Sequence, residues 1–361
     1  MKIGIIDADL LDKGTRHPNL ALMKISGFYK NKGYNVELVD DYSTINKYDN
    51  VFMSKVFDFT NVPIDVNKYD NLEIGGTGFF GINAPNLPDE IEHYMPDYSL
   101  YDDYIEKEIS KGVKPSVYSD YRDGSIGFIT RGCFRKCEFC VNKKYDKPVK
   151  HADIDEFLDN NRKLIYLWDD NFLAYPGWKE ELEKIKATGK RFQFRQGLDI
   201  RLINNEKAEI LSNMKYHGDY IFAFDHIKDK EIIEKNLKIW RNYCKKTTKL
   251  YVLCAYDSQD VDDIISVFER IIILMKYGCI PYIMRYKDYE NSELRGMYIT
   301  LARWCNQPSM FKKNSFRQYC RDVKSNGEGS AAMRYLTEFE DKYPEVAKKY
   351  FDLRYEDLKE I

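Results

Sequence analysis

Short apolar runs dominate the first hundred residues, together with one stretch of helical spacing. Residues 2–8 form a mostly apolar run of the kind that makes a buried strand. Apolar side chains then recur at helical spacing from Leu20 to Tyr29, and Gly33 marks the expected end of that helix. Three further strands are expected at residues 36–39, 50–56 and 71–74, before a tight turn at residues 75–78. This order predicts a Rossmann-like, doubly wound parallel domain over residues 1–100.

The rest of the chain has a second pattern, in which strands and helices alternate. Residues 80–124 are rich in Pro, Asp and Tyr without clear periodicity, and we expect residues 101–124 to be a linker. Six strands are then predicted near residues 126–130, 164–168, 192–195, 220–224, 250–255 and 282–285. Helices are predicted between them, near residues 153–161, 177–188, 205–214, 228–243 and 260–277.

Six β/α units are too few for a closed eight-fold barrel, which needs about 250 residues. We therefore expect an open, partial (β/α)6 barrel over residues 125–290. A helical C-terminal region should follow over residues 291–361, with a Gly/Ser break at residues 325–330. The fold class expected for the whole chain is α/β.

Composition and charge favour a globular protein over a membrane protein or a general polyanion-binding protein. Apolar residues make up 43% of the 361 residues and charged residues 32%, as in soluble globular proteins. The 56 basic and 58 acidic residues give a net charge of −2, which argues against general binding to polyanions. The sequence contains no apolar run long enough for a membrane helix and no signal-peptide layout at its start. We expect a cytoplasmic protein.

Three of the eight cysteines lie within eight residues. They are Cys133, Cys137 and Cys140, in the motif Arg-Gly-Cys-Phe-Arg-Lys-Cys-Glu-Phe-Cys. Three thiolates at this spacing can bind three irons of one [4Fe–4S] cluster and leave the fourth iron without a protein ligand. Zinc is the alternative, but a structural zinc site usually has four protein ligands and no fourth Cys or His lies nearby. The motif follows the first barrel strand, and strand carboxyl ends carry the chemistry of such barrels.

The motif and its context resemble the radical S-adenosylmethionine (SAM) superfamily. The likeness consists of Cys-x3-Cys-x-Phe-Cys after the first strand, the preceding Ile-Thr-Arg-Gly-Cys and the six β/α units that follow. It implies that the amino and carboxylate groups of SAM chelate the open iron. It also implies that the reduced cluster cleaves SAM to methionine and a 5′-deoxyadenosyl radical, which abstracts hydrogen from a substrate that the sequence does not identify.

The first hundred residues resemble the cobalamin-binding-like domain that precedes many radical SAM enzymes. Three stretches carry this likeness. They are His-Pro-Asn-Leu at residues 17–20, Ile-Gly-Gly-Thr-Gly-Phe at residues 74–79, and residues 87–101, which lead toward the cysteine motif. The Asp-x-His-x-x-Gly run that supplies an axial His to cobalt is missing, and His17 does not fit it. We expect a vestigial domain, although some relatives bind cobalamin without that His. Methylthiotransferases are excluded, because they carry three N-terminal cysteines and this chain has none before Cys133.

The resemblance also points to residues that would hold SAM. The end of the second strand, Asp169, Asp170 and Asn171, should meet the ammonium group, where a carboxylate forms charge-assisted hydrogen bonds. A helix cap is the alternative for these aspartates. Gln196, Asp199 and Arg201 after the third strand could meet the ribose and the carboxylate of SAM, or form an internal ion pair. Three further cofactor contacts are expected from Asp225, Arg285 and Phe139.

Other residues have weaker signals. Cys254 and Tyr256, at the end of the fifth strand, could donate a hydrogen atom to a substrate radical, although a buried Cys usually acts as a small hydrophobe. Cys279, Cys305 and Cys320 are too widely spaced to suggest a second cluster. The C-terminal region mixes basic residues with aromatic ones, as at Lys312 and Phe316, which suits either nucleic-acid binding or a solvated amphipathic helix.

The favoured hypothesis is a radical SAM enzyme, an oxidoreductase or transferase, that contains a [4Fe–4S] cluster and SAM. We expect an electron donor such as flavodoxin or ferredoxin, and neither a membrane nor a nucleic acid as partner. One alternative is a cobalamin-dependent radical SAM methyltransferase, which cobalamin co-purification would separate from the first. Another is a non-catalytic iron–sulfur or zinc protein that binds RNA or a partner chain, which metal and sulfide analysis would separate from both.

Overall fold

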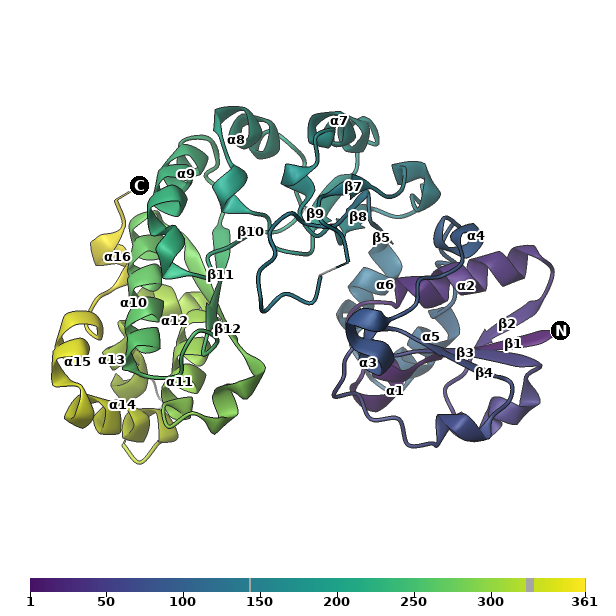
Figure 1. Ribbon diagram of the computed structural model, residues 1–361, viewed down its shortest axis with the longest axis horizontal. Coiled ribbons are helices and arrows are strands. Elements are labelled where there is room, and N and C mark those ends of the chain that lie inside the picture. The colour runs from purple at the N-terminus through teal and green to yellow at the C-terminus, as the bar shows by residue number, and fades with distance from the viewer. Residues whose placement is uncertain (143, 323–327, 361) are drawn as a thin grey trace. The chain divides into compact units, whose positions relative to one another are not determined.

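The chain divides into two compact units, Met1–Arg195 and Gln196–Ile361. A computed structural model describes residues 1–142, 144–322 and 328–360 (Figure 1). Within these residues, no helix is both long and apolar enough to span a bilayer.

A four-stranded parallel sheet begins the first unit. Its strand order is β2-β1-β3-β4, with bounds β1 Lys2–Asp7, β2 Asn35–Leu38, β3 Asn50–Ser54 and β4 Leu72–Gly75. Helix α1, Ala8–Lys13, follows β1 directly, and α2, Leu20–Asn31, connects β1 to β2. The side chain of Asn19 caps α2 by accepting a hydrogen bond from the Leu22 N–H. The expected Rossmann-like domain is therefore present.

Residues 101–124, which we expected to be a linker, are instead folded against this domain. Residues 101–124 contain helices α5 Asp102–Ser110 and α6 Ser119–Asp123, and α3 Thr77–Phe80 and α4 Asp89–Glu92 precede them. Tyr101 and Ile105 are buried in the same core as Ile3 and Ile5. The Tyr101 hydroxyl also donates to the Asp7 carboxylate at 2.9 Å. The apolar side chains of residues 101–124 are sparse and half of them are tyrosines, so the short helical spacing of Tyr101, Ile105 and Ile109 is easily overlooked. The other domain bounds suggested by the sequence remain a prediction.

A second parallel sheet completes the first unit, with strand order β5-β8-β9. The strands are β5 Gly124–Gly127, β8 Leu164–Leu167 and β9 Arg191–Phe194, and α7, Trp178–Ala187, precedes β9. Two short antiparallel strands, β6 Thr130–Arg131 and β7 Val149–Lys150, flank the cysteine motif. The helix expected at residues 153–161 is only a 3-10 turn, Ile154–Glu156, because Asp-Asn-Asn at residues 159–161 favours turns.

The second unit contains the other three strands predicted after residue 125 and the C-terminal helices. Strands β10 Tyr220–Ala223, β11 Thr248–Cys254 and β12 Ile280–Arg285 form a parallel sheet. Their connecting helices are α8 Asn205–Ser212, α9 Lys230–Tyr243 and α10 Val261–Lys276. Alternate residues of β11 are buried, as expected for a strand with helices on one face. All six strands predicted after residue 125 are therefore confirmed.

The C-terminal region is helical, as predicted. It contains α11 Arg295–Cys305, α12 Pro308–Lys313, α13 Phe316–Asp322, α14 Ala331–Lys342, α15 Pro344–Tyr350 and α16 Tyr355–Leu358. Aromatic side chains of these helices pack against Phe268 of α10, which ties the region to the second unit. The Gly/Ser break expected at residues 325–330 lies partly outside the described residues.

The packing of α5 gives a stability prediction. Ile105→Ala should lower the free energy of unfolding by about 2–5 kcal/mol, because it leaves a cavity in the core of the N-terminal domain. The shift in the midpoint of urea-induced unfolding measures this. Val117→Ala, at a 42% exposed position of the same segment, is the control and should change the free energy by about 0.5 kcal/mol or less. Equal midpoints for the two variants would show that α5 is not part of the core.

Candidate functional site

The cysteine motif occupies an irregular loop between β6 and β7. The two strands pair through Thr130 with Lys150 and Arg131 with Val149, so both ends of the loop are held together. Gly132 begins the loop with φ +98°, a conformation that favours glycine. A Cβ at this position would also lie 2.5 Å from the Cβ of Tyr145. The local sequence therefore explains why the chain turns sharply just before Cys133.

The three motif cysteines differ from the other five in their surroundings. Cys133, Cys137 and Cys140 are partly exposed, whereas the other five cysteines are buried. Backbone N–H groups point at two of the motif sulfurs, from Arg135 to Cys133 at 3.3 Å and from Asn142 to Cys140 at 3.4 Å. Such donors stabilise negative charge on sulfur and are typical around metal-bound thiolates.

Burial has the opposite effect on the remaining thiols. It raises the pKa of Cys254, Cys279 and Cys320 to about 12, and it also raises the pKa of Cys244 and Cys305. These five groups therefore stay protonated at neutral pH, and a metal binds the thiolate form. Thiolate ligands are accordingly expected from the motif alone.

No three Cys, His, Asp or Glu side chains of the described residues are grouped so that they could hold one metal ion. A four-iron cluster makes a different demand on its ligands, because each thiolate binds its own iron atom.

The two aspartates after β8 hold the segment that leads into the cysteine loop. Asp169 is buried, and its carboxylate accepts hydrogen bonds from the Thr130 N–H at 2.6 Å, the Thr130 hydroxyl at 2.7 Å and the Ile129 N–H at 3.3 Å. Asp170 accepts one from the Gly132 N–H at 2.6 Å. Burial raises the pKa of Asp169 to about 7, while the bonds from Thr130 lower it. Both carboxylates thus bind the backbone at the entrance to the loop, and a contact with SAM stays a prediction.

Asn171, the third residue of this group, contacts the motif directly. Its side chain is buried, and its Nδ2 donates to the Cys133 sulfur at 3.2 Å. Its Oδ1 has no hydrogen-bond partner among the described residues. The same is true of Arg131 Nε and Trp168 Nε1, at the ends of β6 and β8. Buried polar atoms without partners are rare in folded proteins, and a bound ligand is one way in which they are satisfied.

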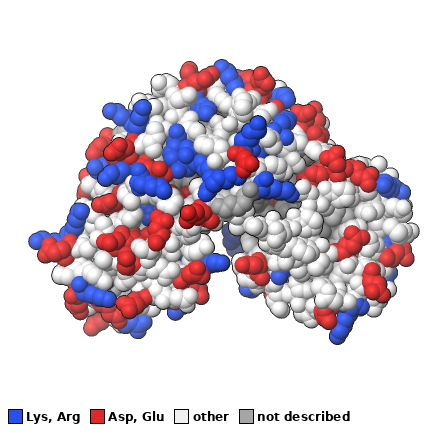
Figure 2. Space-filling view, viewed as in Figure 1, with Lys and Arg blue, Asp and Glu red and all other residues white. Residues whose placement is uncertain are grey.

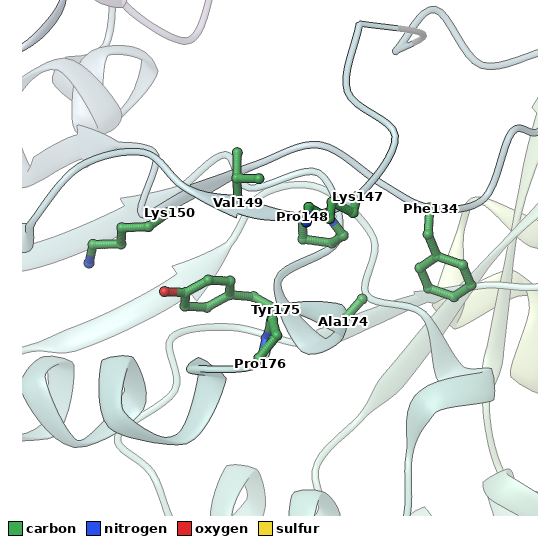
Figure 3. A pocket seen from close by; sticks show the side chains of 8 residues that line it. All are labelled: Phe134, Lys147, Pro148, Val149, Lys150, Ala174, Tyr175 and Pro176. Carbon is green, nitrogen blue, oxygen red and sulfur yellow. The ribbon is translucent and has the colours of Figure 1, made fainter.

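A pocket of about 480 Å³ lies beside the cysteine loop (Figure 3). Phe134 is at one end of it, and Tyr175 and Lys150 are at the other. Its remaining lining residues are Lys147, Pro148, Val149, Ala174 and Pro176. The volume is within the usual range for small-molecule sites, and the walls are mostly apolar. Sequence reasoning missed this pocket, because its residues come from three separate stretches without a shared motif.

The other cofactor contacts expected from the sequence lie in the second unit, apart from Phe139, which is partly buried in the cysteine loop. Asp199 accepts a hydrogen bond from Arg201 Nε at 2.8 Å, and Arg201 also pairs with Asp229 at 2.7 Å. This is the internal ion pair that was the alternative for Asp199 and Arg201. The remaining three residues lie at or just after strand ends.

Each of those three has a different environment. Gln196 is exposed. Burial raises the pKa of Asp225, whose backbone carbonyl accepts a hydrogen bond from the buried Arg270 at 2.7 Å. Arg285 is exposed and donates to the Tyr289 hydroxyl at 2.8 Å. Contact of any of these residues with a cofactor stays a prediction.

Cys254 and Tyr256 occupy different environments at the end of β11. Cys254 is buried on the face of the strand that packs against α10, where Asp263 and Arg270 act on its thiol. Tyr256 is partly exposed, and its ring lies 4.8 Å from that of Tyr286. Ala255 between them has φ +61°, a left-handed conformation that places successive side chains differently from a strand. A radical role for either residue stays a prediction, and Tyr256 is the more accessible.

One pair at these strand ends was missed. His226 Nδ1 lies 2.8 Å from Asp257 Oδ2. The two residues are 31 positions apart, so no local motif predicts that they pair.

The basic and aromatic C-terminal stretch does not present its rings to solvent. Trp304, Phe311, Phe316 and Tyr319 are all buried, so they cannot stack on bases. Arg317 pairs with Glu340 and with Asp352. Lys324 lies outside the described residues. On the face shown in Figure 2, both signs of charge are interspersed. The aromatic residues of this stretch therefore belong to the core of the helical region.

Comparison with known proteins places this site in context. No protein-family model matches the chain, and no curated protein matches its sequence. The structure of the radical SAM methyltransferase TsrM from Kitasatospora setae, with cobalamin and a [4Fe–4S] cluster bound, matches with a TM-score of 0.53 at 12% identity. The match covers 79% of this chain and 74% of TsrM. TsrM with tryptophan and a SAM analogue bound gives the same TM-score and identity, over 78% and 72% of the two chains.

A third structure, SuiB from Streptococcus suis bound to SAM, is less similar. Its TM-score is 0.35 at 13% identity, over 57% of this chain and 58% of SuiB, and it supports no further argument. At the identity seen with TsrM, a structural match shows the fold. The α/β fold expected from the sequence is therefore confirmed, and the chain has a fold similar to that of a radical SAM methyltransferase.

Proposed function

We propose that this chain is a radical SAM enzyme whose [4Fe–4S] cluster is held by Cys133, Cys137 and Cys140. One observation carries the proposal: the three motif cysteines share the loop between β6 and β7 and are partly exposed, and the sulfurs of Cys133 and Cys140 each accept a hydrogen bond from a backbone N–H. The fold similarity to TsrM supports it. The five buried cysteines have environments that disfavour the thiolate.

The residues around the loop fit such a group. The partnerless Oδ1 of Asn171 is a hydrogen-bond acceptor next to Cys133, and the ammonium group of SAM is a donor. Asp169 and Asp170 accept hydrogen bonds from the backbone N–H groups of Thr130 and Gly132, just before Cys133. When bound, the cluster would supply the electron that cleaves SAM to methionine and a 5′-deoxyadenosyl radical, which then abstracts hydrogen from the substrate. An electron donor of the flavodoxin or ferredoxin class is part of the proposal.

A cobalamin-dependent methyltransferase is the second candidate, because TsrM is a methyltransferase that binds cobalamin. In a doubly wound domain, ligands bind at the carboxyl edge of the sheet where strand order reverses, here between β1 and β3. At this point the Asp9 carboxylate accepts hydrogen bonds from the Val56 N–H at 2.7 Å and the Phe57 N–H at 3.3 Å. The loop after β3 is thereby tied to the end of β1. His17 pairs with Asp120 at 2.6 Å. These internal contacts favour the first candidate.

The cluster can be tested by metal analysis. Anaerobic reconstitution should give about four iron and four sulfide atoms per chain. Replacing Cys133, Cys137 and Cys140 together by Ala should abolish this, since the other five cysteines are buried. Cys320→Ala removes a buried thiol of α13 and serves as the control, which should keep full iron content. A full cluster in the triple variant would show that the ligands lie elsewhere.

The aspartates after β8 can be tested on the same preparation. The double change Asp169→Ala, Asp170→Ala should lower iron content, because unsatisfied buried N–H groups cost about 1–3 kcal/mol each and release the loop. The change of both to Asn keeps an acceptor oxygen and should retain more iron. Asp123→Ala removes a carboxylate that pairs with exposed Lys163 and is the control. Full iron content with lost SAM affinity in the Ala variant would instead support the ammonium contact inferred from the sequence.

Cobalamin binding separates the two candidates. With the carboxyl edge tied by Asp9, added hydroxocobalamin should not form a stoichiometric complex with the chain. Visible absorption after gel filtration measures this. A tight one-to-one complex would favour the methyltransferase.

A further inference from the structure

Asn171 places a side-chain amide against one thiol of the cysteine loop. Its Nδ2 lies 3.2 Å from the Cys133 sulfur, and its side chain is only 5% exposed. The backbone N–H of Arg135 donates to the same sulfur at 3.3 Å. Cys133 therefore receives two donors, one from the backbone and one from a side chain that can be exchanged.

The backbone that carries this amide is held on both sides. A thiolate only accepts hydrogen bonds, so the NH2 group and not the carbonyl must face Cys133. The preceding Asp169 and Asp170 are held by the backbone of residues 129–132. On the other side, the backbone carbonyl of Asn171 accepts a hydrogen bond from the Ala174 N–H at 3.1 Å. The backbone of Asn171 is thus held next to Cys133 by contacts within the chain.

We infer that Asn171 sets the reduction potential of the cluster through its hydrogen bond to Cys133, an inference that rests on the proposed function. Reduction adds negative charge to the cluster and its thiolates. A hydrogen bond to a ligand sulfur stabilises that added charge and so raises the potential. Burial of the amide strengthens the effect, because water cannot replace the lost donor. Removing the N–H group should make the cluster harder to reduce.

The test is a redox titration of the reconstituted full-length chain, followed by electron paramagnetic resonance of the reduced cluster. Asn171→Leu has nearly the same shape but no donor. At a fixed potential its ratio of reduced to oxidised cluster should fall by about threefold to tenfold, and tenfold corresponds to about 59 mV for one electron. Asn142→Leu is the matched control. Its bond to the Cys140 sulfur is made by the backbone N–H, so its ratio should equal that of the wild type.

Asn171→Asp provides a second variant, since it preserves the shape and replaces the donor by an acceptor. Its ratio should fall at least as far as that of Asn171→Leu. If either variant holds full iron and titrates as the wild type does, the inference is overturned. It is also overturned if both variants remain folded but lose iron, because Asn171 would then be needed to hold the cluster. Absence of a cluster from the wild-type chain would instead refute the proposed function before any variant is compared.

Discussion

The hydrogen bonds from the backbone of residues 129–132 to Asp169 and Asp170 are the contacts on which the candidate site depends. The cysteine loop is irregular, so no ladder of strand or helix bonds determines where its sulfurs lie. Its position must therefore come from contacts with a rigid element. Strand β8 is the middle strand of its sheet and is fully buried, which makes its end a firm anchor. The two carboxylates at that end, Asp169 and Asp170, accept hydrogen bonds from backbone N–H groups of residues 129–132, where the chain enters the loop.

The same anchoring explains why the three motif cysteines differ chemically from the rest. The loop leaves the sheet at Gly132 and keeps its sulfurs partly exposed, near backbone donors. Cysteines of the second unit, such as Cys279 and Cys305, lie wholly within the core, where burial raises the thiol pKa. Identical side chains thus have different surroundings. Position in the fold, more than residue type, separates the partly exposed cysteines of the loop from those of the core.

Sequence reasoning succeeded where one local pattern determines the structure. The strands around residues 126 and 250 were predicted because apolar runs bury themselves whatever surrounds them. The cysteine spacing was equally informative, since it is a local property. Helix α5 was missed although Tyr101, Ile105 and Ile109 recur every four residues, because the helix is only nine residues long and charged residues separate these apolar positions. The helix expected after residue 153 ends early because turn-forming residues follow at once.

The roles of polar residues were harder to predict, because their partners are far away in the sequence. Asp169 and Asp170 were expected to face a cationic ligand, yet their oxygens accept N–H groups from about forty residues earlier. A carboxylate offers only acceptors; Asp169 accepts three hydrogen bonds and Asp170 one, so both are engaged with the loop before any ligand binds. An amide offers both a donor and an acceptor. Asn171 can therefore bond the Cys133 sulfur with its NH2 group while its oxygen remains available to a bound cation. This difference between carboxylate and amide separates Asp169 and Asp170, which hold the loop entrance, from Asn171, whose side-chain oxygen has no partner among the described residues.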